Sequence, residues 1–147
     1  DSSEAKYAEL LAKADAVLTQ FPDEPVGAFA KLVKGRALHE QGQYAEAAAL
    51  FKEWSDGHPG APEQAFVLQS LAISQAAAGQ TDAAVGSLDE LKVLNEEAWG
   101  ESAGYQIARI QEAAGDKDKA RKSYELLLEQ YPDSDRTELV KMYLDFL

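Results

Sequence analysis

Three short segments built around a glycine recur along the chain at almost constant spacing. They read EQGQY (40–44), AAGQT (77–81) and AAGDK (113–117). Their glycines, Gly42, Gly79 and Gly115, are 37 and 36 residues apart. A period of this length is typical of folds in which one small supersecondary unit is repeated and stacked on its neighbours. The spacing therefore predicts a linear array of similar units rather than one irregular core.

The same kinds of side chain stand at fixed distances from each glycine. Glycine allows the left-handed turn that ends one helix, small residues let two helices approach closely, and large ones fill the space between neighbouring pairs. A proline then ends the second helix. Seven residues before each glycine stand Gly35, Ala72 and Ala108, and five residues after it stand Ala47, Ala84 and Ala120. Large residues follow nine and twelve positions after the glycine, namely Phe51, Leu88 and Tyr124, and then Trp54, Leu91 and Leu127. The residues seventeen positions after it are Pro59, Glu96 and Pro132.

No stretch alternates apolar and polar residues with the period of a strand. We therefore expect a lone helix at about 3–20, helical hairpins at roughly 24–57, 62–95 and 99–131, and a last helix at about 134–147. The last helix would cover the open end of the array, because it carries apolar residues at helical spacing, namely Leu139, Val140, Tyr143, Leu144 and Leu147.

We expect one domain over residues 1–147, without an internal boundary or linker. Its predicted segments are an N-terminal half-repeat (1–22), three repeats (24–59, 62–96 and 99–132) and a C-terminal capping helix (134–147).

The repeat resembles the tetratricopeptide repeat, whose second helix carries an A-x-x-x-F…P pattern after a glycine turn. The residues that carry this resemblance are Gly35 in a first helix and, in the second helices, Ala47, Phe51 and Pro59; Ala84 and Leu88; and Ala120, Tyr124 and Pro132. The usual tryptophan of the first helix is replaced by Lys31, Leu68 and Gly104. The resemblance implies an all-α fold, a right-handed superhelical array of about eight helices.

The chain is strongly acidic, which restricts its partners. Its 14 Lys and Arg against 26 Asp and Glu give a net charge of −12, and such a surface repels nucleic acid and anionic lipid. There is no apolar run long enough to cross a bilayer. Cysteine is absent, so disulfides, thiolate nucleophiles and cysteine metal sites are excluded. Because the chain begins at Asp1 without Met, we interpret it as a trimmed or processed product whose targeting segment would have lain upstream.

The segment GESAG (100–104) matches the G-x-S-x-G pattern around the nucleophilic serine of many esterases. That pattern requires a strand before it and a helix after it, whereas this chain offers no strand. Both histidines, His39 and His58, also precede the serine. We therefore expect no enzyme here: Glu101 or Ser102 would cap a helix, and Gly104 would permit close packing.

We also expect neither metal nor cofactor. An EF-hand loop starting at Asp133 would require glycine and glutamate where the chain has Glu138 and Leu144. His58 stands alone without a partner at the spacing of a zinc site, and there is no glycine-rich phosphate loop.

The resemblance implies that the inner, concave face of the array, formed by the first helices, binds extended or helical peptides. One stripe of each first helix lies 13, 10, 6 and 3 residues before the glycine. It would offer aromatic anchorage and arginines for a partner's carboxylates; alternatively, the aromatics pack in the core and the arginines are paired internally. The stripe residues are Phe29, Leu32, Arg36 and His39; Phe66, Gln69, Ile73 and Ala76; and Ser102, Tyr105, Arg109 and Glu112.

The predicted function is a non-catalytic module that binds a protein or peptide. The alternative is a structural scaffold, cytoplasmic or in the envelope, that self-associates through the first helix or the capping helix. The endings QFPDEP (20–25) and QYPDSD (130–135) are similar to those of bacterial envelope tetratricopeptide proteins, including membrane-anchored assembly or quality-control factors. This similarity implies a periplasmic or membrane-tethered location. The lysine and asparagine clamp for chaperone tails is not visible at the stripe positions, which disfavours a chaperone-tail adaptor.

Overall fold

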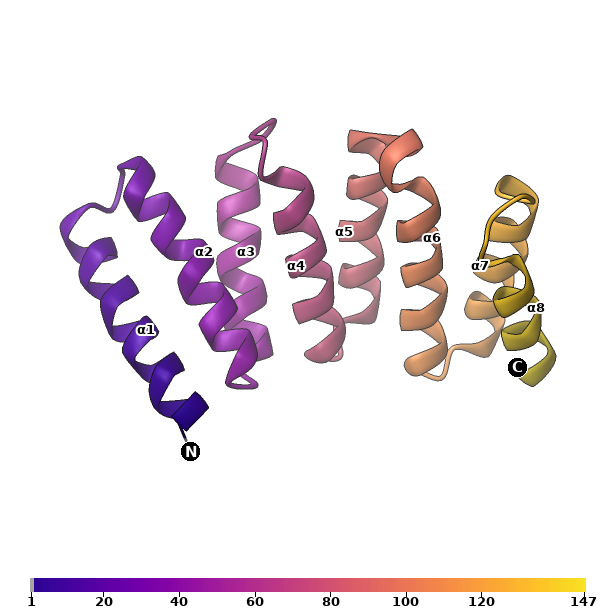
Figure 1. Ribbon diagram of the computed structural model, residues 1–147, viewed down its shortest axis with the longest axis horizontal. Coiled ribbons are helices and arrows are strands. Elements are labelled where there is room, and N and C mark those ends of the chain that lie inside the picture. Colours follow the sequence, from indigo (N-terminus) through magenta and orange to yellow (C-terminus); the bar gives the residue numbers. More distant parts are fainter. Residues whose placement is uncertain (1) are drawn as a thin grey trace. The chain divides into compact units, whose positions relative to one another are not determined.

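The computed structural model describes residues 2–147, and within that range it contains eight helices and no strand (Figure 1). The expected all-α solenoid of helical hairpins is confirmed. In chain order the helices are α1 (Ser2–Gln20), α2 (Pro25–Glu40), α3 (Tyr44–Gly57), α4 (Gln64–Ala77), α5 (Thr81–Leu94), α6 (Glu96–Ala113), α7 (Lys117–Gln130) and α8 (Thr137–Phe146).

The helices fall into two compact units, one ending at Ala78 and the other starting at Gly79. In the first unit α1 packs on α2, α2 on α3 and α3 on α4, and α2 also touches α4. In the second unit α5 packs on α6, α6 on α7 and α7 on α8. Contacts between helices that are adjacent in sequence dominate each unit, which is the pattern of a helical repeat fold.

The repeated glycines adopt the backbone conformation for which the sequence pattern selects them. Gly42 and Gly115 have φ of 78° and 83°, which a residue with a Cβ adopts only at a cost. After Gly42, the backbone N–H of Gln43 donates to the carbonyl of Leu38 over 2.9 Å. That bond satisfies a carbonyl at the end of α2, so the chain reverses within a few residues and enters α3.

The residues at the repeat positions form the core, as the spacing predicts. The three alanines after the glycines are fully buried, and so are the large residues four and seven positions after those alanines. Gly35 shows why the facing position must be small: a Cβ there would lie 2.9 Å from the ring of Phe51. The buried residues at these positions are Ala47, Ala84 and Ala120; Phe51, Leu88 and Tyr124; Trp54, Leu91 and Leu127; and, on the first helices, Gly35, Ala72 and Ala108.

The middle repeat ends differently from the others because Glu96 stands where they have proline. Helix α6 begins at Glu96, three residues before the expected start of the hairpin at 99. Asn95 is its N-cap, and the side-chain oxygen accepts a hydrogen bond from the N–H of Ala98 over 3.0 Å. The expectation that Glu101 or Ser102 caps this helix was wrong, since both lie more than a turn inside it.

A side-chain hydrogen bond joins the start of α6 to the end of α7 in the second unit. The Tyr131 hydroxyl donates to the Glu96 carboxylate over 2.7 Å. Gly100 leaves room for this bond, because a Cβ at that position would overlap both side chains. Burial of the phenol, followed by its hydrogen bond to Glu96, raises the pKa of Tyr131 to about 12.

Helix α8 covers the core of the second unit with one face only. Val140 is buried, and Tyr143, Leu144 and Leu147 pack against the cluster of α6 and α7 residues around Tyr124. Leu139 lies outside that contact and is exposed, together with Met142 and Phe146. The helix therefore closes one side of the core and leaves an apolar stripe of its own uncovered.

We predict opposite effects for alanine at two glycines of the second unit. Gly115→Ala should destabilise the fold by about 1–2 kcal/mol, because alanine disfavours the left-handed conformation. Gly86 lies on the exposed face of α5, where an added Cβ would meet open space, so Gly86→Ala should stabilise by about 0.5–1 kcal/mol through helix propensity. Urea unfolding measures both. Equal losses at the two positions would contradict the assigned turn.

We also predict that alkali weakens the contact between Tyr131 and Glu96. The unfolded pKa of tyrosine is near 10 and that of Tyr131 is about 12, so its contribution is complete below pH 10 and falls as pH rises through this window. Between these values only the unfolded chain has released the proton. Tyr131→Phe should flatten the decline of unfolding free energy between pH 10 and 12 and remove one late phenolate from the absorbance titration. Loss of a phenolate that forms near pH 10, with the late one retained, would show that Tyr131 ionises as a free phenol.

Candidate functional site

The first unit contains an apolar groove of about 410 Å³ between α1, α2 and α4. Residues of α2 and those in or next to α4 supply most of its lining, and α3 contributes the aromatic ring of Phe51. The apolar groove is lined by Tyr7 and Leu10 of α1; Phe29, Leu32, Val33, Arg36 and Ala37 of α2; Phe51 of α3; and Glu63, Phe66 and Ser70 in or next to α4.

The groove contains four of the residues that the sequence pattern assigns to the peptide-binding stripe. Phe29, Leu32 and Arg36 recur at spacings of three and four residues on α2, and Phe66 projects from α4. The small residues of α2 face its neighbours and are buried, so the stripe is turned away from those contacts. Phe29 and Phe66 are 66% and 54% exposed. They are therefore available at the surface instead of being packed in the core.

The polar stripe residues of the first unit differ in how firmly they are held. Arg36 bonds Glu40 over 2.7 Å, but its side chain is largely exposed, and an exposed pair of this kind contributes little. The Nδ1 of His39 lies 3.0 Å from the Ser74 hydroxyl, and the imidazole ring packs edge-on against Tyr44. Arg36 is thus free to exchange its partner, whereas His39 joins α2 to α4.

The three remaining stripe residues of the first unit lie on α4. Gln69 and Ala76 are half-buried, and Ile73 is exposed but does not line the groove.

The stripe residues of the second unit are engaged with one another and with later helices. Arg109 donates to Glu112 over 2.6 Å and lies 4.2 Å above the ring of Tyr143. Tyr124 donates to the same carboxylate over 2.6 Å, and its burial and this hydrogen bond raise its pKa. Tyr105 is half-buried and packs beside Tyr143. These contacts join α6 to α7 and α8.

GESAG lies inside α6, and each of its polar side chains has a structural contact. The carboxylate of Glu101 accepts hydrogen bonds from Ser134 and Arg136, both over 2.6 Å. These bonds, that of Ser134 first, lower the pKa of Glu101. The Ser102 hydroxyl donates to the carbonyl of Trp99 over 3.2 Å, and Gly104 admits the side chain of Leu127. Ser102 therefore lies within a continuous helix, and its hydroxyl is hydrogen-bonded to the backbone of that helix.

Two further kinds of feature are absent from the described part of the chain. Residues 2–147 contain no group of three or more His, Asp and Glu side chains that could hold a metal ion. Over the same range, none of the helices combines the length and the apolar character needed to span a membrane.

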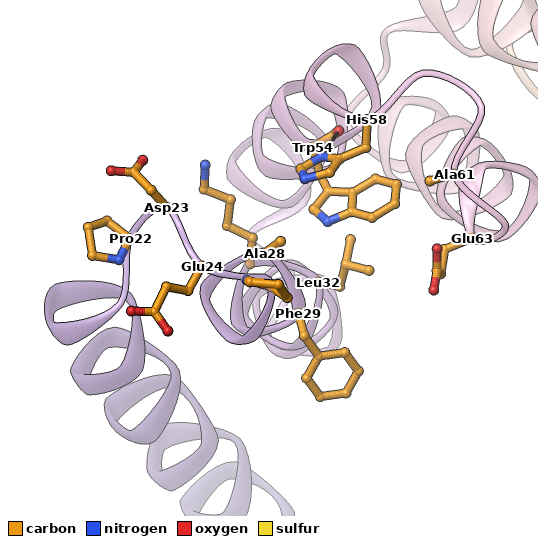
Figure 2. Close-up of a pocket in the computed structure, with 12 residues that line it drawn as sticks. Pro22, Asp23, Glu24, Ala28, Phe29, Leu32, Trp54, His58, Ala61 and Glu63 are labelled. Carbon is orange, nitrogen blue, oxygen red and sulfur yellow. Dashed lines mark hydrogen bonds between the residues drawn. The ribbon is translucent and has the colours of Figure 1, made fainter.

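A second hollow, the acidic pocket, lies on the other side of Phe29 and has a volume of about 500 Å³ (Figure 2). The end of α3 lines one side of it, where the imidazole of His58 stacks on the indole of Trp54 with ring centres 4.4 Å apart. Its lining combines the turn between α1 and α2, the first half of α2 and the segment before α4: Pro22, Asp23, Glu24, Pro25, Ala28, Phe29, Lys31, Leu32, Trp54, His58, Ala61 and Glu63.

The stripe pattern did not indicate several residues of these two sites. The pattern could have predicted Glu63, because this residue lies three positions before Phe66 and so continues the same helical stripe. Tyr7 and Trp54 were not, since neither belongs to a first helix. Only the packing of α1 and α3 against α2 brings their side chains to the same hollows.

Comparisons with known proteins agree with this architecture. Two family models, both described as tetratricopeptide repeat, match residues 28–53 and 102–134. No curated protein matches the sequence significantly.

Solved structures match over most of the chain at low sequence identity. A tetratricopeptide repeat protein from Parabacteroides merdae has a TM-score of 0.69 at 18% identity, covering 99% of this chain. This chain spans only 60% of that protein. The structure of MamA has a TM-score of 0.67 at 18% identity, covering 89% of this chain and 72% of MamA.

Tetratricopeptide-like repeats of a putative kinesin light chain from Podosopora anserina have a TM-score of 0.68 at 20% identity, covering 88% of this chain and 68% of theirs. These likenesses establish the fold. The two family-model matches, which cover 28–53 and 102–134, support a tetratricopeptide repeat-like family for this chain.

Proposed function

We propose that this chain is a non-catalytic protein–protein interaction module whose apolar groove receives large apolar side chains from a peptide segment of a partner. The observation that carries the proposal is the exposure of Phe29 and Phe66 at the rim of a preformed, mostly apolar groove. The repeat fold itself supports protein binding as the general function, by analogy with its family.

The physical chemistry of the groove favours such an occupant. Large aromatic side chains are the residues that contribute most at protein interfaces. A hollow of about 410 Å³ is within the size range of ordinary ligand sites. An apolar side chain that enters it would cover both phenylalanines and remove their apolar surface from water.

The partner in this proposal is a protein segment and not a nucleic acid or an anionic membrane, since the net charge of −12 repels both. The segment would lie along α2 and α4, where Arg36 offers an exposed guanidinium. The peptide-binding role of Tyr105, Arg109 and Glu112 stays a prediction, as does the location of the module in a bacterial envelope factor.

A second candidate function is self-association, which the exposed apolar stripe of α8 favours. Leu139, Met142 and Phe146 lie on successive turns of that helix and are exposed. A second copy of the chain could cover them, and the chain would then act as a scaffold.

The groove is tested by selecting displayed peptides on the wild-type protein and measuring their affinities for two matched variants. Peptides with large apolar residues should bind Phe29→Ser/Phe66→Ser about tenfold or more weakly, the loss expected for interface aromatics. Phe146→Ser removes another exposed phenylalanine, on α8, and should leave binding unchanged. Equal affinities for all three proteins would exclude the groove as the site.

The scaffold function predicts a mass that increases with protein concentration in sedimentation equilibrium. Phe146→Ser should abolish that increase, whereas Phe29→Ser should retain it. A wild-type protein that stays monomeric over the whole concentration range would contradict self-association through α8.

A further inference from the structure

We infer that a small pocket in the second unit, formed over Gly104, binds the side chain of a tyrosine from a partner protein. The pocket has a volume of about 200 Å³ and lies over α6, between α5 and α7. None of its lining residues belongs to the apolar groove of the first unit, so this site is additional to the proposed function and independent of it. Three features point to tyrosine: open space over a helical glycine, apolar walls, and one amide donor.

Gly104 contributes no side chain to the pocket, and little else occupies the space above it. Apart from its own helix backbone and its chain neighbours, a Cβ at Gly104 would have one heavy atom of the described chain within 4 Å, Leu127 Cδ1 at 3.1 Å. At Gly35, by contrast, the ring of Phe51 fills the space over the glycine. In the middle repeat the position of Gly104 is taken by Leu68, which is 1% exposed. The pocket is therefore a space that a large side chain could fill and for which this chain supplies none.

The walls of the pocket are apolar and come from three neighbouring helices. Val85 of α5, Ile107 of α6 and Leu126 of α7 line it. Ile107 is buried and Val85 half-buried, whereas Leu126 is 46% exposed. An aromatic ring between these side chains would remove their apolar surface from water. Small-molecule sites usually have volumes of about 300–1,000 Å³, so a pocket of about 200 Å³ suits a single side chain.

The amide group of Gln111 supplies the second, independent observation. Gln111 is only 7% exposed and lines the pocket two turns along α6 from Gly104. Its Oε1 accepts a hydrogen bond from the Ser123 hydroxyl over 2.6 Å, whereas its Nε2 has no partner among the described residues. Unlike the Nε1 of Trp54, this nitrogen is not fully enclosed, so an occupant of the pocket can reach it. An occupant that covers the amide must bring an acceptor, since a donor buried without a partner is costly.

Tyrosine is the side chain that meets both requirements. Its ring suits the apolar walls, and its hydroxyl can accept a hydrogen bond from Gln111 Nε2. Gly104 and Gln111 are about 10 Å apart along α6, so a phenol ring that lies between them can bring its hydroxyl to the amide. Phenylalanine would cover the amide without an acceptor, and the indole of tryptophan offers only a donor.

The charges at the rim of the pocket do not favour an ionic occupant. Asp89 and Lys92 lie three residues apart on α5, and both line the pocket. Opposite charges that stand side by side largely offset one another for a ligand placed between them. A carboxylate would also have to leave water for a space with apolar walls. The neutral phenol avoids both costs.

The test is a titration with N-acetyl-tyrosine amide, whose blocked ends imitate a residue within a protein chain, followed in a ¹H–¹⁵N spectrum. The backbone signal of Gly104 and the side-chain NH₂ signals of Gln111 should move in a saturable way, while the signal of Gly42 in the first unit should not. N-acetyl-phenylalanine amide should bind about fivefold more weakly, the loss expected for one neutral hydrogen bond. Equal affinities for the two amides, or signals that do not move, would overturn the inference.

Three variants, with circular dichroism to check that each keeps its helices, complete the design. Gly104→Leu should abolish binding because its side chain would occupy the pocket. Gly86→Leu is the matched control, since a Cβ at Gly86 would meet open space on the exposed face of α5, and it should bind like the wild type. Gln111→Leu keeps the size and removes the donor, so it should bind the two amides equally. Undiminished binding by Gly104→Leu, or a tyrosine preference retained by Gln111→Leu, would contradict the assigned pocket.

Two further outcomes would replace the partner protein by another occupant. Free L-tyrosine that binds much more tightly than the blocked amide would make the pocket a site for the free amino acid. A Gly104 signal that moves when the protein is diluted without any probe would assign the pocket to a tyrosine of a second copy of this chain. Either result would overturn the assignment to a partner protein.

Discussion

The close approach of helices at small residues is the constraint on which the rest of this structure depends. Ala47, Ala84 and Ala120 have no exposed surface, and a single Cβ at Gly35 would meet the ring of Phe51. With larger residues at these positions the helices would separate, and the aromatic and aliphatic residues one and two turns later would lose their contacts. The repetition of this contact lets short helices form a core without a sheet or disulfides.

This packing also determines which side chains remain available for a partner. Because α2 turns its small residues toward its neighbours, the large residues Phe29 and Leu32 face the hollows beside it. The stripe residues of α6 are engaged in contacts with later helices. Glu112 accepts a hydrogen bond from the hydroxyl of Tyr124, and Arg109 lies over the ring of Tyr143. The first unit therefore presents a groove, and the second uses equivalent positions to attach its last helices.

Most of the fold could be predicted from the sequence because its signals are local. The left-handed glycines, the buried alanines and the prolines after α1, α3 and α7 act within one or two turns of their own position. The start of α6 was missed for an equally local reason: without a proline at Glu96, Asn95 caps a helix that begins immediately. Most of the groove lining was not indicated, since seven of its eleven residues lie off the stripe: Tyr7, Leu10, Val33, Ala37, Phe51, Glu63 and Ser70.

The sequence by itself determined the period, the helices and the residues that pair them, since these follow from backbone preferences and side-chain size at fixed spacing. Only the tertiary structure decided which members of the stripe are free. Exposure depends on which side chains from distant segments reach a residue: Tyr143 reaches Arg109 across 34 positions of the chain, whereas Phe29 has an open hollow on either side. Periodicity carries no information about such contacts, because it describes one helix at a time.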